Sequence, residues 1–209
     1  MNIPVVYEDE GLIVFNKPYG LLTIPSPNQK IRTLTSIVNA ELSAKGIPYR
    51  LHPCHRLDKE TSGLIIYAKG KSLQKKMMEE FKQGRVEKKY LAFVRGALPK
   101  DEGTIRNKIS GQSAITGYSV LERKNGFTVV EARPLTGRTN QIRIHFKEIG
   151  HPLLGERKFA FGRDFDIKAK RLCLHAFFLK FTHPVTKKTL TLKCEPENKM
   201  ADFLKEHSK

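Results

Sequence analysis

Acidic residues and cysteines are both scarce in this sequence. Its 209 residues include 21 Asp and Glu against 38 Lys and Arg, and three cysteines. An odd cysteine count without CxxC spacing argues against a disulfide framework and against a structural zinc site. His52, Cys54 and His55 lie close together, but no second ligand cluster follows them, so we expect no metal ion.

Long hydrophobic runs are also missing. The longest apolar stretches, such as residues 63–68 and 172–179, stop far short of the ~20 residues that span a bilayer. The N-terminus, MNIPVVYEDEG, is acidic where a signal peptide needs a basic region and a long apolar run. We therefore expect a soluble, cytoplasmic protein with no membrane partner. Its 39% hydrophobic content excludes a disordered chain.

The formal net charge of +17 exceeds what solubility requires. The commonest functional explanation is a polyanionic partner such as RNA or DNA. A lysine-rich surface that reflects general composition is the alternative. The basic residues are spread along the chain and form no terminal tail, so an electrostatic footprint has to be a folded surface.

Apolar periodicity predicts a mixture of strands and helices. Strands are expected at residues 3–7, 11–16, 63–69, 86–95, 118–123, 127–133, 172–181 and 189–193. Helices are expected at residues 34–42 with Thr33 as N-cap, from an N-cap at Ser72 to Gly84, at 138–148 with Ile142, Phe146 and Ile149 buried, and at 200–206. Without strict βαβ alternation, this order favours an α+β fold on a large, mainly antiparallel sheet.

Residues 55–63, HRLDKETSG, carry the densest group of reactive side chains. They directly precede an apolar strand, and loops at strand ends commonly present reactive groups. Asp58 lies between Arg56 and Lys59, and a carboxylate beside cations stays ionised and can act as a nucleophile or a charge stabiliser. The same residue types also form an ordinary Asx turn or helix N-cap, so both interpretations stay open at this point.

A second group, TGRTNQIRIH at residues 136–145, combines two arginines, two amides and a histidine. Such a set favours a helix that faces a cleft or a phosphate. With Ile142 and Phe146 in the core, Arg138 and Arg143 flank them, where one arginine can pair with a buried carboxylate. A solvated helix face is the alternative.

These two segments, with EKKYLAFVRG at 87–96 and LCLHAFFLKFTHPVTKK at 172–188, resemble successive motifs of the RluA family of pseudouridine synthases. The resemblance begins at DEGLIVFNKPYGLLTIP and runs almost to the C-terminus. It implies isomerisation of uridine in RNA to its C-glycoside, without cofactor or metal. It also implies one catalytic domain over residues 1–209, a pseudouridine-synthase-like α+β fold whose mixed, mainly antiparallel sheet is flanked by helices and loops, with an active-site cleft across the sheet.

The resemblance also implies catalytic roles. Asp58 matches the family's essential aspartate, which attacks the ribose C1′ or removes the C2′ proton to give a glycal. Tyr90 matches the tyrosine that packs on the base and helps to remove the C5 proton. Arg143 matches the arginine that pairs with the aspartate, and Arg138 is the second candidate for that role.

RNA contacts are expected at Arg56, His55, Arg138 and Thr61. Arg56 matches the residue that fills the gap left by the target base. A base inside a helix has to be flipped out at a cost of a few kcal/mol, which an inserted arginine and phosphate contacts can offset. We expect a stem-loop of ribosomal or transfer RNA as partner, and a monomeric protein.

Two features depart from the family pattern. Asn140 stands where histidine is expected, and we expect little catalytic effect because no proton transfer is assigned there. Many relatives carry an N-terminal S4-like domain, for which this chain has no room, so RNA recognition is expected from the catalytic domain itself. His175 and His183 match the last motif and are interpreted as structural.

Two other functions remain open from the sequence. One is an RNA chaperone or RNA-binding module that uses the same fold, although Asp58, Tyr90 and Arg143 are all present. The other is a glycosidase acting on small molecules, which would lack its usual second carboxylate because Glu60 lies too close along the chain.

Overall fold

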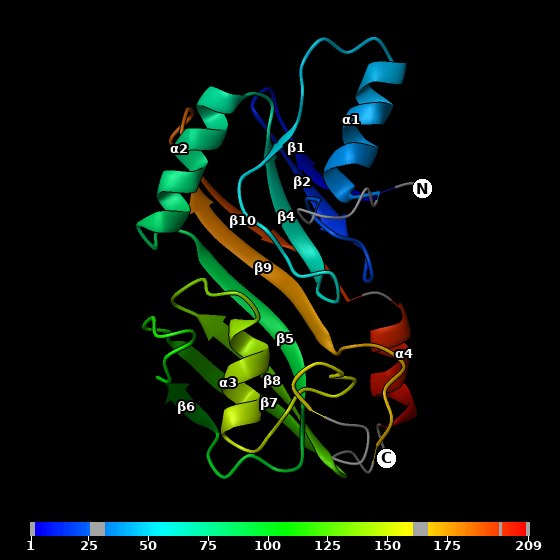
Figure 1. Cartoon of the computed structure of the whole chain (residues 1–209), viewed down its shortest axis with the longest axis vertical. Helices are drawn as coiled ribbons and strands as arrows, with labels where there is room; N and C mark the ends of the chain where they lie inside the picture. The colour runs from blue at the N-terminus through cyan, green and yellow to red at the C-terminus, as the bar shows by residue number, and fades with distance from the viewer. Residues whose placement is uncertain (1–2, 26–31, 161–166, 197, 208–209) are drawn as a thin grey trace. The chain divides into compact units, whose positions relative to one another are not determined.

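The chain folds into two units that share one long strand, β9 (Leu174–Thr182) (Figure 1). The computed structural model describes residues 3–25, 32–160, 167–196 and 198–207. One unit contains Met1–Glu87 and Phe178–Glu195, and the other contains Lys88–Phe177 and Pro196–Lys209. The N-terminal half of β9 therefore belongs to the second unit and its C-terminal half to the first.

The first unit holds strands β1 (Val5–Glu8), β2 (Leu12–Lys17), β3 (His52–Pro53), β4 (Ser62–Ala68) and β10 (Thr189–Lys193). Their order is β1-β2-β4-β9, with β3 on β4 and β10 on β9. The pairs β1–β2, β2–β4, β3–β4 and β9–β10 are antiparallel. All seven residues of β4 are buried, which explains its continuous apolar sequence: a strand covered on both faces has no polar side.

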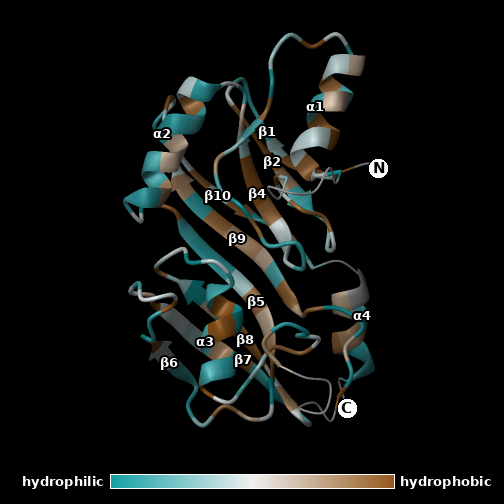
Figure 2. Ribbon diagram, in the orientation of Figure 1, coloured by the Kyte–Doolittle hydropathy of each residue, from teal (hydrophilic) through white to brown (hydrophobic). Residues whose placement is uncertain are grey.

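Helices α1 (Leu34–Ala44) and α2 (Lys71–Lys82) cover opposite faces of these strands. Met77 of α2 packs with Leu12, Val14, Leu64 and Ile66 on one face. On the other face, the α1 hydroxyl of Thr35 lies 2.9 Å from the phenol of Tyr67 in β4. In Figure 2, β4 is largely brown, whereas α2 is mostly teal with a few paler or brown segments.

The second unit holds strands β5 (Glu87–Arg95), β6 (Glu102–Ile105), β7 (Thr116–Lys124) and β8 (Phe127–Pro134), in the order β9-β5-β8-β7-β6. The Asn125-Gly126 turn closes the β7–β8 hairpin, with Lys124 opposite Phe127. Helix α3 (Gln141–Glu148) packs on β7 and β8. Helix α4 (Asn198–Glu206) packs on the opposite face, where Phe203 contacts Phe93 and Phe127.

The predicted α+β architecture is confirmed, and so is the Thr33 cap of α1, whose hydroxyl accepts from the Ser36 amide while the Ser36 side chain accepts from the Thr33 amide. The predicted start of α2 was wrong by two positions, since the N-cap of the helix is Gly70 and not Ser72. Gly70 has φ +133°, a conformation that glycine adopts without a steric penalty and that ends the preceding extended segment. The short strands β3 and β6 were not predicted.

The predicted start of α3, at Arg138, was also wrong. The helix begins at Gln141 because Asn140 has φ +54°, a left-handed conformation that interrupts a right-handed helix. Arg138 and Thr139 consequently lie in the preceding loop. Ile149, expected in the core, caps the helix C-terminus and is 36% exposed. Within the described residues, no helix has the length and apolar character needed to cross a bilayer.

Candidate active site

The loop that carries Asp58 is anchored on both sides of the carboxylate. Before it, Leu57 is buried, and its backbone N–H and C=O both bond to the buried Thr23 hydroxyl, at 3.3 and 3.0 Å. After it, the Thr61 amide donates to the Asp58 carbonyl at 3.1 Å, and Ser62 begins the fully buried β4. Asp58 itself is half-buried. A backbone turn thus follows Asp58, and the carboxylate lies just before a rigid, buried strand.

A buried lysine lies beneath this loop. Lys17 at the end of β2 is 0% exposed, and its ammonium donates to the carbonyls of Pro18, Leu21 and Lys59 at 3.0, 2.7 and 3.5 Å. The Gly20 amide adds a bond to the Lys59 carbonyl. The ammonium thus ties the segment after β2 to the Asp58 loop and places a fixed positive charge under it. Sequence reasoning missed this role, because a lysine in a strand is usually solvated.

The neighbours of Asp58 differ in what they offer to a substrate. Arg56 is exposed and makes no hydrogen bond or ion pair within the described part of the chain. His55 accepts the Ile66 amide at Nε2, 3.0 Å away, and its ring lies 4.4 Å from that of Phe81. Thr61 is buried. Arg56 therefore projects to solvent, whereas His55 and Thr61 are held by the fold, and all three RNA contacts stay predictions.

In the second unit, Tyr90 and α3 lie on the same face of the sheet. Tyr90 on β5 pairs with Ala132 on β8, which pairs with Tyr118 on β7, and directly paired residues share a face. The Tyr118 ring packs against Phe146 of α3 at 5.7 Å. Tyr90 is half-buried, on the side opposite Leu91 and Phe93. Tyr90 and the helix that carries Arg143 thus lie on one face of this unit's strands.

Arg143 on that helix is buried and paired. Its Nε and Nη2 donate to the two carboxylate oxygens of Glu156, each at 2.7 Å, and its Nη1 donates to the Asn140 side chain at 2.9 Å. The side chains are 4% and 0% exposed. Burial alone raises the pKa of Glu156, but the hydrogen bonds from Arg143 and from the amides of Arg157 and Lys158 hold it below its usual value. Such a two-pronged pair fixes the guanidinium plane.

Gln141 fastens the loop before α3. Its Oε1 accepts from the Thr136 hydroxyl and the Arg138 amide, and its Nε2 donates to the Ile115 carbonyl and the Thr116 hydroxyl. Every polar atom of this buried amide is satisfied, as a buried amide requires. The polar side chain of Gln141 therefore holds the helix on the sheet, whereas Arg138 is exposed, with its Nε donating to the Ser113 carbonyl at 3.1 Å.

The histidines of the last motif match the structural interpretation. His183 is buried, and its Nδ1 accepts the amides of Val185 and Thr186 in the turn between β9 and β10. Its Nε2 lies 3.3 Å from an Asp9 oxygen. His175 is buried in β9. Among the described residues, no group of three His, Cys, Asp or Glu side chains is arranged to hold a metal ion.

Glu156, like Lys17, was not singled out by the sequence interpretation. It ends the segment GHPLLGE at residues 150–156, which lies on no helix or strand, 13 positions from Arg143. The expectation that an arginine of this motif pairs with a buried carboxylate nevertheless holds for Arg143. The pairing of Arg143 with Asp58 stays a prediction.

Comparison with known proteins shows the family to which this chain belongs. Residues 11–148 match the family model described as RNA pseudouridylate synthase. The chain belongs to the RluA family of RNA pseudouridine synthases. It is 36% identical to the Yersinia pestis dual-specificity RNA pseudouridine synthase RluA, over 92% of this chain and 98% of that one. It is 34% identical to the Bacillus subtilis uncharacterized RNA pseudouridine synthase YlyB, over 98% of this chain and 72% of that one.

Solved structures agree with the family. The human RNA pseudouridylate synthase domain containing 4 superposes with a TM-score of 0.82 at 25% identity, covering 98% of this chain and 92% of that one. The protein is thus an isomerase that acts on uridine in RNA. The residues that match the family model include both anchored segments, the Asp58 loop and the Arg143 helix.

Proposed function

We propose that Asp58 is the catalytic aspartate of this pseudouridine synthase. The observation that carries the proposal is the contrast at the loop: Leu57 and Thr61 are buried and bonded, while Asp58 between them is half-exposed. A carboxylate held in this way is presented to a substrate at little further entropic cost. Arg56, exposed beside it, is placed to occupy the space that a flipped base leaves.

The reaction follows from the chemistry of an ionised carboxylate. Asp58 attacks the ribose C1′, or takes the C2′ proton to give a glycal, and the C1′–N1 bond breaks with its electron pair going to uracil. The uracil turns and its C5 bonds to C1′; in the first route this displaces the Asp58 carboxylate from C1′, and in the second the protonated Asp58 returns its proton to C2′. The C5 proton then leaves to restore the ring and N1 takes up a proton, so that the product is an isomer of uridine. Tyr90 offers a flat face to the base. A guanidinium at Arg143 favours the ionised aspartate, and Glu156 fixes the plane of that guanidinium.

We propose that both units together form one catalytic domain, and that the folded surface of this domain recognises RNA. The net charge of +17 supports a stem-loop substrate bound by phosphate contacts. We propose ribosomal or transfer RNA as that substrate, met in the cytoplasm by a monomer. The dual-specificity name of the Yersinia relative supports more than one class of RNA.

Replacement of the carboxylate tests the proposal. Asp58→Asn should abolish tritium release from RNA labelled at uridine C5 while it binds that RNA with unchanged affinity. Asp101→Asn is the matched control, because that side chain is 79% exposed and pairs with Arg123 at the surface. Full tritium release by Asp58→Asn, with the control also active, would exclude Asp58 as the catalytic group. Mapping pseudouridines in total RNA with and without the gene would identify the substrate.

A further inference from the structure

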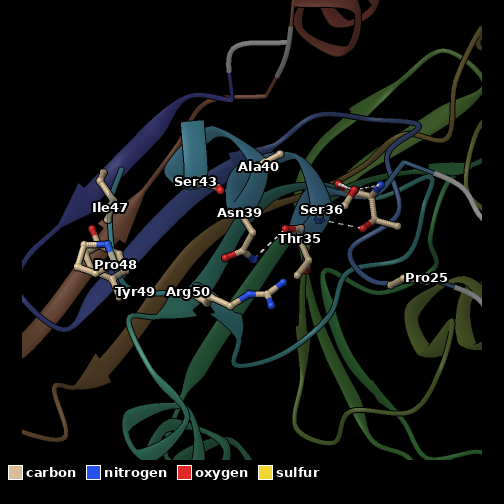
Figure 3. A pocket seen from close by; sticks show the side chains of 11 residues that line it. Pro25, Thr35, Ser36, Asn39, Ala40, Ser43, Ile47, Pro48, Tyr49 and Arg50 are labelled. Carbon is tan, nitrogen blue, oxygen red and sulfur yellow. Dashed lines mark hydrogen bonds between the residues drawn. The ribbon is translucent and has the colours of Figure 1, made fainter. Parts of the chain in front are cut away.

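A pocket lies beside α1 in the first unit. It measures about 630 Å³, within the roughly 300–1,000 Å³ typical of small-ligand sites. Figure 3 shows Asn39, Ala40 and Ser43 on the helix side, Ile47 and Pro48 at one end, and Arg50 lying along the pocket toward Thr35. All of these residues belong to the first unit.

The walls of this pocket are fixed by hydrogen bonds that are already complete. The Asn39 side chain donates to the Thr35 and Leu51 carbonyls and accepts the Leu51 amide, all within 2.9 Å. Thr33 and Ser36 bond to each other in the N-terminal cap of α1. These contacts hold the segment before β3 against α1, so the pocket is formed before any ligand arrives.

Two lining side chains are left to bind a ligand. Arg50 and Ser43 are exposed, and neither makes a side-chain hydrogen bond or ion pair with another described residue. Tyr49 also lines the pocket, with the Lys69 ammonium 5.2 Å from its ring centroid. That lysine is paired with Glu8 at 2.7 Å, so Arg50 supplies the pocket's uncompensated positive charge.

One guanidinium, one free hydroxyl and an apolar end match the parts of a nucleotide. The guanidinium fits a phosphate or stacks on a base plane, the hydroxyl suits a base edge or ribose, and Ile47 and Pro48 cover an apolar face. We propose that this pocket is an accessory RNA subsite that takes one unpaired nucleotide of the substrate other than the target uridine. The inference deepens the RNA-modifying function and rests on it.

Hydrogen bonds also connect the pocket wall to the loop that carries Asp58. The Thr35 hydroxyl donates to the Thr23 carbonyl at 2.7 Å, and the Thr23 hydroxyl donates to the Leu57 carbonyl, one residue before Asp58. Two hydrogen bonds therefore join the pocket wall to the loop that holds the carboxylate. A nucleotide bound here sits on the same rigid support as the target site, which makes the pocket suited to selecting RNA by sequence or loop shape.

Two variants of the full chain test the subsite. Arg50→Ala removes the charge, and Ala40→Trp fills the pocket from an exposed helix position without changing any charge. Both should weaken RNA binding and raise KM by about five- to twentyfold, with single-turnover rates at saturating RNA within twofold of the original protein. Arg50→Ala should also lower the salt dependence of binding by about one phosphate contact. Lys100→Ala, an exposed lysine outside the pocket, is the control and should do neither.

A direct readout separates this idea from the catalytic one. RNA carrying 4-thiouridine at single loop positions, one at a time, should crosslink to a peptide covering residues 33–50 from one non-target position, and Ala40→Trp should abolish that crosslink. The same crosslink is expected in Asp58→Asn, so loss of catalysis leaves this result intact. Unchanged KM in both pocket variants, or crosslinks to this peptide from the target position alone, would overturn the subsite.

Discussion

Arg143 and Glu156 face each other through two hydrogen bonds of 2.7 Å in the interior of the second unit. Removing one partner leaves a buried charge without compensation, which costs about 3–5 kcal/mol. We therefore expect Glu156→Gln to lower the urea midpoint strongly and to reduce kcat, because the guanidinium loses its orientation. Arg143→Lys should reduce kcat as well, since an ammonium lacks the planar fork.

The double variant Glu156→Leu with Arg143→Met separates these two effects. It replaces the buried pair by apolar groups, so stability should recover relative to Glu156→Gln while activity should not. Equal activity in Glu156→Gln and the original protein would mean that the carboxylate has a structural role alone.

Low pH should weaken the ion pair between Arg143 and Glu156. The pKa of Glu156 lies below its ordinary value of 4.5 in the folded protein, since the bonds from Arg143 and two backbone amides outweigh the effect of burial. A carboxyl with a depressed folded pKa contributes its full stabilisation above the unfolded pKa and loses it as the pH falls through the folded pKa. The stability difference between the original protein and Glu156→Gln should therefore be constant near pH 7 and shrink below about pH 4.5.

Urea titrations at several pH values measure this difference. Asp9 also has a lowered pKa, where burial is outweighed by bonds from Tyr7, Leu12 and Gly11. Its contribution is present in both proteins and cancels in the comparison. A difference that stays constant down to pH 3 would contradict the assignment to Glu156.

The sequence predicted elements well where local signals were strong. The N-cap of α1, the buried run of β4 and the Asn-Gly hairpin all depend on residues within a few positions of one another, and all three are present. The start of α3 depended on one backbone conformation, at Asn140, that composition does not reveal. Glu156 and Lys17 depended on contacts across many positions, and no local pattern marks a residue that a distant segment will bury.

The backbone conformation and the side-chain bond of Asn140 explain why asparagine can stand where the family pattern has histidine. Its φ of +54° is a conformation that asparagine and histidine tolerate better than β-branched residues, and its side chain accepts from Arg143 at 2.9 Å. We expect Asn140→His to keep kcat within about threefold. Asn140→Val should lose roughly 1–2 kcal/mol of stability from backbone strain and also reduce kcat, because the Arg143 guanidinium loses its hydrogen bond to the Asn140 side chain. Steady-state kinetics with thermal melts would contradict this if both variants behaved alike.

Thr23 should act on catalysis through Leu57. Its buried hydroxyl satisfies both backbone groups of Leu57, so Thr23→Val leaves them unpaired at a cost of about 1–3 kcal/mol. Because Asp58 follows Leu57 directly, a shift of that backbone misplaces the carboxylate, and a misplacement near 1 Å can lower the rate by about 10²-fold. We expect kcat to fall at least tenfold with KM nearly unchanged, and Thr23→Ser to restore it.

A second buried threonine provides the control. Thr128 in the second unit is 0% exposed, and its hydroxyl also bonds one backbone carbonyl and one backbone amide, donating to Gly96 at 2.7 Å and accepting from Leu98 at 3.4 Å. Thr128→Val should therefore lose similar stability but keep kcat, because neither residue that it bonds adjoins a proposed catalytic group. If the two valine variants lost kcat in equal proportion, stability alone would account for the effect and the Thr23 hydroxyl would not position Asp58.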